Sequence, residues 1–322
     1  MKRNLQHLLF AASLSLGTVM TVSPIESFAA SSINIQSVLQ QERAWAGLSS
    51  KRVKVAEIDW AYSEGGTKGK PVLLLVHGLA GSRDNWNRVA RYLTLHYHVI
   101  IPDLPGQGDS RVPSDFDYSI PNLTEKLRRF AEAIQIDKSL HVAGHSMGGA
   151  VSLLYAAQYP LDTKSLLLID SAGVFKSGNT PYLKDPNLLR NFIVSKPGDF
   201  DRLFKIAAQI PPFIPNELKV EQEKLMISNV ANTTKLVEQL ILMSKSYTPE
   251  TFALAARSID LPTLIIWGEK DQIINVEAAA ELKGLLKNAQ DPIILKGVGH
   301  MPLLEQEQIL VQHYLKFLTP LK

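Results

Sequence analysis

Ser146 is the residue of this chain whose surroundings most favour chemistry. It lies in Gly144-His145-Ser146-Met147-Gly148, a G-x-S-x-G pentapeptide between a stretch that predicts a strand and one that predicts a helix. In a tight turn of this kind, glycines two residues to either side let the strand and helix approach closely, and the serine hydroxyl stays accessible. We therefore interpret Ser146 as a nucleophile, with Gly144 and Gly148 as the glycines that the turn requires.

A serine hydroxyl needs an adjacent base, because it is a poor nucleophile near neutral pH. Among the eight histidines, His300 stands in the Gly-rich stretch "GVGHMP", directly after the last predicted strand. A loop at the end of a strand can bring a base over the serine, so we expect His300 to be that base. His77 is expected to order its own loop. The histidines interpreted as solvated or structural are His7, His96, His98, His141 and His313.

The base in turn needs a carboxylate that fixes its tautomer and stabilises the imidazolium. Asp271 and Asp170 each follow a predicted strand and lie between Ser146 and His300 in the chain. We favour Asp271, on the turn after the penultimate core strand. Asp170 is kept as an alternative acid, and its other interpretation is a structural hydrogen-bond acceptor at the base of a cap.

Acyl transfer through a serine also needs N–H donors for the oxyanion of the tetrahedral intermediate. The backbone N–H of Met147 is one candidate, because it opens the predicted helix. The N–H of Leu79 is the other, in the loop "HGLAGS" after the first long apolar strand. The segment "LPGQGDS" at 104–110 lacks the Lys-Ser/Thr ending of a phosphate loop and is predicted to be a turn.

The elements that would position these residues alternate along the chain. Apolar runs that predict buried strands alternate with amphipathic or apolar stretches that predict helices, which indicates a mostly parallel sheet with helices on both faces. The predicted strands are "VKVAEI" (53–58), "PVLLLVHG" (71–78), "HVIIPDLPGQG" (98–108), "SLHVAG" (139–144), "KSLLLIDSAG" (164–173), "LPTLIIWGEKDQI" (261–273) and "PIILKGVGH" (292–300).

This alternation stops over residues 175–258, where only helical pieces are predicted. The simplest organisation is a core in two parts, 53–174 and 259–322, with the helical segment inserted as a cap and 30–52 as an N-terminal segment. Apolar cap residues are candidates for the walls of an acyl pocket, although we expect more than half of them to pack the cap onto the core. They are Phe192, Ile193, Phe204, Ile210, Phe213, Ile214, Leu240 and Met243.

The N-terminus has the features of an export signal. Two basic residues precede an interrupted apolar run over residues 8–22, and the small-residue stretch "SFAASS" follows. We predict a signal peptide over 1–29, cut after Ala29 or Ala30, and export to the periplasm or the medium. The alternative is an uncleaved N-terminal membrane anchor.

The composition limits the chemistry and the partners. The 322 residues are 45% hydrophobic and 20% charged, with a net charge of +3 and no cysteine. Disulfides, cysteine-based zinc sites and a thiol nucleophile are therefore excluded. Basic and acidic residues are interspersed, which gives a nucleic-acid partner little support.

With Ser146, Asp271 and His300 in this order, the chain resembles the α/β-hydrolase superfamily over roughly residues 70–318. The stretches that carry the resemblance are "HGLAGSRDNW", "DLPGQGDS", "GHSMGGA", "IDSAGVF", "WGEKDQII" and "GVGHMP". Within the superfamily it looks most like bacterial family V lipases and monoacylglycerol lipases. The resemblance implies an α/β-hydrolase fold and hydrolysis of fatty-acyl esters such as glycerides through an acyl-enzyme, at a site that needs no metal or cofactor.

Three alternatives to a lipase stay open at this point. A hydrolase of small soluble esters and a C–C bond hydrolase have the same fold, and a non-catalytic ligand-binding relative is a third. The cap, which sets the choice of substrate, holds no motif that separates them. The expected partner is a small-molecule or lipid ester, with transient contact at a lipid interface, and the sequence leaves the oligomeric state open.

Overall fold

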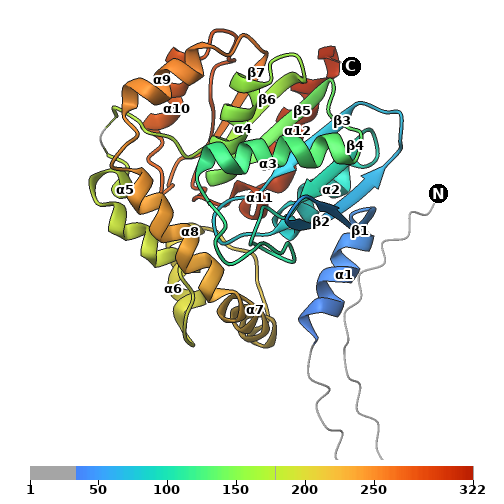
Figure 1. Cartoon of the computed structure of the whole chain (residues 1–322), viewed down its shortest axis with the longest axis vertical. Helices are drawn as coiled ribbons and strands as arrows, with labels where there is room; N and C mark the ends of the chain where they lie inside the picture. The colour runs from blue at the N-terminus through green and yellow to red at the C-terminus, as the bar shows by residue number, and fades with distance from the viewer. Residues whose placement is uncertain (1–33, 178, 322) are drawn as a thin grey trace, which may run out of the picture. The chain divides into compact units, whose positions relative to one another are not determined.

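The computed structural model describes residues 34–177 and 179–321. Its centre is an eight-stranded sheet in the order β1-β2-β4-β3-β5-β6-β7-β8 (Figure 1). The strands are β1 (Leu48–Val55), β2 (Ile58–Gly66), β3 (Val72–Val76), β4 (His98–Pro102), β5 (Leu140–His145), β6 (Thr163–Ile169), β7 (Thr263–Gly268) and β8 (Ile293–Leu295). The six neighbouring strands β4, β3, β5, β6, β7 and β8 pair in parallel. Strand β2 pairs antiparallel with both β1 and β4. The predicted mostly parallel sheet is confirmed.

Both faces of the sheet are buried, which is why its central strands are continuous apolar runs. Side chains alternate between the faces along each strand. In β3, Leu74 and Val76 belong to one hydrophobic cluster, and Leu73 and Leu75 belong to the other. The first cluster is closed by helices α3, α4 and α10, and the second by α2 and α12 (Figure 1).

The core helices follow the strands as the sequence predicts. Ser82 caps a 3₁₀ turn, η1 (Arg83–Trp86), which continues into α2. The others are α2 (Asn87–Leu93), α3 (Ile120–Ala133), α4 (Met147–Gln158), α10 (Glu277–Leu285), α11 (Pro302–Glu305) and α12 (Glu307–Leu318), followed by η3 (Thr319–Leu321). In α3, the buried residues Leu123, Leu127 and Phe130 form an apolar face.

The N-terminal part of the sheet differs from the prediction. The expected strand over 53–58 is wrong, because these residues are the end of β1, a turn with Ala56 at φ +49°, and the start of β2. Together β1 and β2 form an antiparallel hairpin at the sheet edge. A helix, α1 (Ile35–Trp45), precedes it and is capped by Asn34. The predicted signal peptide lies outside the described residues.

Residues 175–258 hold only helices among the part that the structure describes, as expected. They are α5 (Pro181–Lys184), η2 (Pro186–Phe192), α6 (Asp199–Ala207), α7 (Asn216–Ser228), α8 (Val230–Met243) and α9 (Pro249–Arg257). In Figure 1, α5 to α8 gather to one side of the sheet, while α9 lies beside α10. The cap therefore stands over one edge of the parallel strands.

The same edge gathers the residues that the sequence singled out. In a parallel sheet the carboxyl ends of neighbouring strands meet at one edge, where open α/β sheets bind ligands. Ser146 directly follows β5, and Asp170 directly follows β6. Asp271 and His300 follow β7 and β8 within a few residues.

Candidate active site

Ser146 stands at a sharp turn between β5 and α4. Its φ of +55° and ψ of −124° lie in a region that residues with a Cβ rarely adopt. Its backbone N–H donates to Ile169 O at 3.0 Å, which holds the turn on β6. The strained conformation, held by the surrounding backbone, turns the side chain out of the strand, and Ser146 is 6% exposed.

Two glycines make this turn sterically feasible. A Cβ on Gly144 would lie 2.2 Å from the carbonyl oxygen of Gly148. A Cβ on Gly148 would lie 2.4 Å from the carbonyl oxygens of both Val76 and His77. Strand β5, helix α4 and the end of β3 therefore touch backbone to backbone, as the prediction for these two positions requires.

The structure brings Ser146, His300 and Asp271 together. His300 Nε2 lies 2.8 Å from Ser146 Oγ, and His300 Nδ1 lies 2.7 Å from Asp271 Oδ2. Because the carboxylate accepts from Nδ1–H, Nε2 carries the free lone pair and accepts from the serine hydroxyl. Asp271 Oδ1 accepts from the N–H groups of Ile273 and Ile274, so the carboxylate is itself fixed.

Asp170, the alternative acid, is fully buried but is not hydrogen-bonded to His300. Its Oδ1 accepts from Gly268 N at 2.8 Å, which matches the interpretation as a structural acceptor. Burial, and then the neighbouring charge of Asp271, raises the pKa of Asp170 well above its usual value. The charged form of Asp170 is therefore disfavoured by its buried position beside Asp271.

The side chains of Asp170, Asp271 and His300 lie close enough together to be considered as ligands of a metal ion. One nitrogen or oxygen atom from each of Asp170, Asp271 and His300 lies within 4.8 Å of the others. Both ring nitrogens of His300 are engaged, one by Asp271 and the other by Ser146. The arrangement fits proton transfer rather than a cation ligand set.

The loop of residues 77–81 lies against the start of α4, and we call it the oxyanion loop after the role that the sequence predicts for Leu79. Ala80 N donates to Gln107 Oε1 and Gly81 N to Gly78 O. Among the described residues, no acceptor is bonded to the N–H groups of Leu79 and Met147. These two N–H groups are thus free to bind a ligand, and they are the two that the sequence analysis predicts as donors to an oxyanion.

His77 orders this loop as expected. Its Nδ1–H donates to Gly78 O at 2.8 Å, and its Nε2 accepts from Leu104 N at 2.9 Å. Burial lowers the pKa of His77 to about 4, so the ring stays neutral near pH 7. It joins the oxyanion loop to the turn after β4.

Two further residues hold the loop of His300, and the sequence analysis assigned neither of them. His145 Nε2–H donates to His300 O at 2.7 Å, and burial lowers the pKa of His145 to about 3, which keeps it neutral. Glu305 accepts from four backbone N–H groups, those of Gly299, Met301, Gln209 and Ile210. The last two belong to the cap, so one carboxylate joins the His300 loop to the cap. Glu305 is the last residue of the short helix α11, which begins at Pro302, and this position carried no recognisable signal in the sequence.

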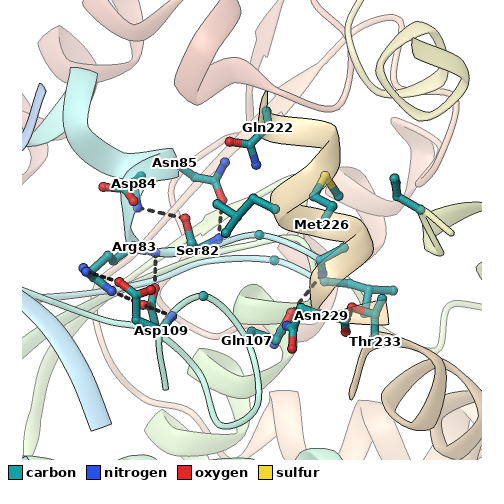
Figure 2. Close-up of a pocket in the computed structure, with 18 of the residues that line it drawn as sticks. Ser82, Arg83, Asp84, Asn85, Gln107, Asp109, Gln222, Met226, Asn229 and Thr233 are labelled. Carbon is teal, nitrogen blue, oxygen red and sulfur yellow. Dashed lines mark hydrogen bonds and ion pairs between the residues drawn. The ribbon is translucent and has the colours of Figure 1, made fainter. Parts of the chain in front are cut away.

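A cavity of about 870 Å³ has Ser146 and His300 in its lining. Figure 2 shows part of this lining, including Ser82, Gln107 and Met226. One wall is apolar and comes mainly from the cap, and the other is polar and comes from the oxyanion loop and the turn after β4. The apolar lining includes Leu79, Phe192, Val194, Phe200, Leu203, Phe204, Ile214, Leu225, Met226 and Leu304. Phe192, Phe204 and Ile214 were among the candidate wall residues. Ile210 and Phe213 are instead 45% and 90% exposed.

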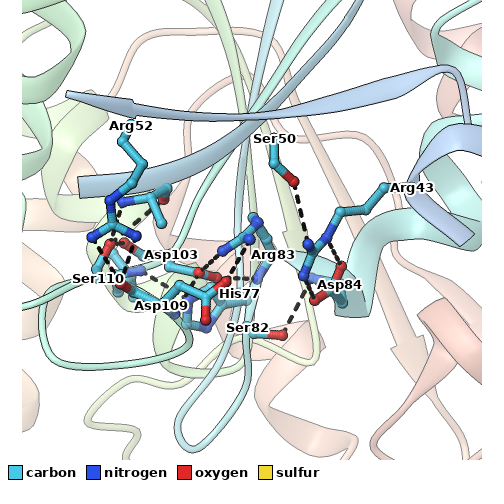
Figure 3. Close-up of polar contacts among 12 residues, drawn as sticks. Arg43, Ser50, Arg52, His77, Ser82, Arg83, Asp84, Asp103, Asp109 and Ser110 are labelled. Carbon is cyan, nitrogen blue, oxygen red and sulfur yellow. Dashed lines mark hydrogen bonds and ion pairs between the residues drawn. The ribbon is translucent and has the colours of Figure 1, made fainter. Parts of the chain in front are cut away.

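Ion pairs brace the polar wall (Figure 3). Arg43 of α1 holds Asp84 with two hydrogen bonds of 2.6 Å, immediately after the oxyanion loop. Arg83 pairs with Asp103 and Asp109 of the turn after β4. These ion pairs connect helix α1 to η1, which follows the oxyanion loop, and connect η1 to the turn after β4.

Comparison with known proteins agrees with this geometry. The profile of the α/β hydrolase fold matches residues 71–307. The chain belongs to the α/β-hydrolase family. Lipase 1 of Psychrobacter immobilis is 35% identical over 315 residues, which are 97% of each chain.

Two solved structures extend the comparison. A candidate lipase from Acinetobacter baumannii is 61% identical with a TM-score of 0.89, covering 90% of this chain and 97% of its own. A membrane phospholipase A, a bacterial virulence factor, is 36% identical with a TM-score of 0.83, covering 89% and 91%. This chain is therefore similar to lipolytic relatives along almost its full length.

Within the residues that the structure describes, no helix has the length and apolar character to span a bilayer.

Proposed function

We propose that this chain is a lipase or esterase, a carboxylic ester hydrolase that works through a Ser146–His300–Asp271 triad. The hydrogen-bonded chain from Ser146 Oγ through His300 to Asp271, at the sharp turn after β5, is the observation that carries the proposal. Similarity to lipases over nearly the whole chain supports the same class of reaction.

In the first step, Ser146 Oγ attacks the ester carbonyl while His300 Nε2 takes the hydroxyl proton. The imidazolium that forms is stabilised by Asp271, which accepts from Nδ1–H at 2.7 Å. The carbonyl oxygen becomes an oxyanion, and the free N–H groups of Leu79 and Met147 bind it. Each such donor is worth about 3–4 kcal/mol of transition-state stabilisation.

The tetrahedral intermediate then collapses. The ester C–O bond breaks, His300 gives its proton to the leaving alcohol, and the acyl group stays on Ser146. His300 deprotonates a water molecule, which attacks the acyl carbon of this acyl-enzyme. The bond between the acyl carbon and Ser146 Oγ then breaks, His300 returns the proton to Oγ, and the fatty acid is released. Both half-reactions use only side chains and backbone N–H groups, so the proposal needs no metal or organic cofactor.

The cavity suits an ester of a fatty acid, with glycerides as the substrates proposed. Its apolar cap wall, which includes Phe192, Phe204 and Met226, can cover an alkyl chain. Its polar wall, with Ser82, Asn85 and Gln107, can face the alcohol. A volume of about 870 Å³ falls within the range of ligand pockets that bury most of a small molecule.

The experiment that tests the proposal compares p-nitrophenyl esters from acetate to palmitate, with wild type beside Ser146→Ala. We expect turnover on long chains that falls by several orders of magnitude in the variant. Activity confined to acetate and butyrate would make the enzyme a short-chain esterase. No turnover on any ester would overturn the proposal and leave a C–C hydrolase or a ligand binder.

We also propose export, because residues 1–29 have the features of a signal peptide. Mass spectrometry of the protein recovered from the periplasm or medium should give an N-terminus at Ala30 or Ser31. An intact Met1 in membrane fractions would support the anchored alternative.

A further inference from the structure

Gln107 is a buried amide in the tight turn after β4. It stands between Gly106 and Gly108, whose φ values are +72° and +53°. Its backbone N–H donates to Leu104 O at 3.0 Å, and its carbonyl accepts from Ser110 N at 3.1 Å. With 2% exposure and both backbone groups bonded, Gln107 is held rigidly.

Its side chain reaches the oxyanion loop. Gln107 Oε1 accepts from Ala80 N at 2.9 Å, and Ala80 adjoins Leu79, whose N–H is free. Ala80 has φ +58°, a left-handed conformation that is unfavourable for a residue with a Cβ. Such a conformation persists only where neighbouring groups hold it. Among the described residues, Gln107 is the one side chain bonded to a backbone N–H of residues 79–81.

The turn that carries Gln107 also contacts the cap. Asn229, between α7 and α8, donates through Nδ2 to Gly106 O at 3.1 Å. Figure 2 shows that Gln107 and Asn229 both line the cavity, where the turn meets the cap. The turn therefore lies between the cap and the oxyanion loop, in contact with both.

We propose that Gln107 is a positioning residue that sets the direction of the Leu79 N–H through its bond to Ala80. This inference rests on the proposed function, because it needs an oxyanion at that N–H. A peptide N–H that is fixed before reaction costs no reorganisation when charge develops. Without the Gln107 bond, the strained loop relaxes and the donor turns away from the oxyanion.

The orientation of the Gln107 side-chain amide leaves its Nε2 group without a hydrogen-bond acceptor. Because Ala80 N–H needs an acceptor, Oε1 must face it, and Nε2 then has no acceptor among the described residues. Gln107 lines the same cavity as Ser146, so a charge placed at Nε2 lowers the potential of the cavity in which the oxyanion forms. This makes Gln107→Glu an informative variant, since it keeps an acceptor for Ala80 and replaces the NH₂ group by a titratable oxygen.

The test uses Gln107→Met and Gln107→Glu in the full-length protein, with Gln158→Met as the matched control. Gln158 is exposed at the end of α4, away from the cavity lining. For Gln107→Met on p-nitrophenyl butyrate we expect kcat to fall about 10- to 100-fold. KM should change less than threefold, and the Ki of a trifluoromethyl ketone should rise by the factor lost in kcat/KM.

For Gln107→Glu, the ratio of its kcat/KM to that of wild type should rise as the pH falls from 9 to 5.5. The protonated carboxyl resembles the amide, whereas the carboxylate repels the oxyanion. A thermal melt of each variant separates this effect from unfolding, and the Glu variant decides the matter if the Met variant does not fold.

Wild-type kcat and inhibitor affinity in Gln107→Met would overturn the inference, as would a loss confined to KM. A pH-independent ratio for Gln107→Glu would also overturn it. If wild type itself turned over no ester, the proposed function would fail, and the inference with it.

Discussion

Gly148→Ala tests the backbone contact that aligns the serine with the oxyanion loop. The added Cβ would lie 2.4 Å from the carbonyl oxygens of Val76 and His77, where ordinary contacts begin at 3.4 Å. Helix α4 and the end of β3 must therefore separate by about 1 Å, since neither oxygen belongs to a flexible side chain. That movement displaces Ser146 and Met147 from Leu79.

The magnitudes follow from this displacement. Overpacking of a rigid site costs about 1–3 kcal/mol, and alanine in place of glycine in a helix returns up to about 1 kcal/mol. We expect a net loss of about 1–2 kcal/mol in the free energy of unfolding. A 1 Å misplacement of catalytic groups lowers the rate about 100-fold. The loss of kcat/KM, expressed as a free energy, should therefore exceed the loss in the free energy of unfolding.

The assay combines urea unfolding with kcat/KM on p-nitrophenyl butyrate, and Gly284→Ala is the control. Gly284 is also a helical glycine, in α10, but its added Cβ meets no atom within 4 Å. That variant should be as active as wild type and up to about 1 kcal/mol more stable. A Gly148→Ala protein with wild-type stability and activity would refute the reasoning.

Two further predictions concern buried charge. The folded state raises the pKa of Asp170 above its unfolded value of about 3.9, so wild-type stability is lost as the pH rises through the folded pKa. The side chain of Asp170→Asn does not titrate, and the variant should keep activity. Its free energy of unfolding should exceed that of wild type by a margin that grows by up to about 1.4 kcal/mol per pH unit from pH 4 up to the folded pKa of Asp170. A difference in melting temperature that does not change with pH would contradict this. Arg43→Met leaves the nearly buried Asp84 carboxylate without its partner and should lower the free energy of unfolding in urea by about 3 kcal/mol. The control Arg190→Met, at the exposed pair with Glu238, should lower it by under about 1 kcal/mol. Equal losses would contradict the account.

Residues whose role depends on local sequence were predictable. The glycines around Ser146 identify the turn because a Cβ at either position would collide with backbone, which is a constraint of spacing alone. The apolar runs of β3 to β7 identify a sheet buried on both faces. His300 and Asp271 could be predicted to lie near Ser146 because parallel strands bring their ends to one edge, so the order of strands limits where a partner can lie.

Residues whose role depends on long-range contacts were missed. Glu305 and His145 hold the His300 loop across the fold, and Gln107 bonds to Ala80 from 27 residues away. The hairpin of β1 and β2 was missed because its exposed outer strand alternates polar residues and lacks the apolar run of a buried strand. In the cap, only the packing of helices decides which apolar side chains face the cavity. Phe204 lines it, whereas Phe213 is exposed.

The central claim is that His300 activates Ser146 as the nucleophile. Mass spectrometry after treatment with a fluorophosphonate measures this directly, because the reagent forms a stable phosphoryl ester with an activated serine. We expect one adduct, on the peptide containing Ser146, with parallel loss of ester hydrolysis, and no adduct in a folded His300→Gln variant. An unlabelled Ser146 in a protein that hydrolyses esters, or an adduct on another serine that abolishes activity, would contradict the account.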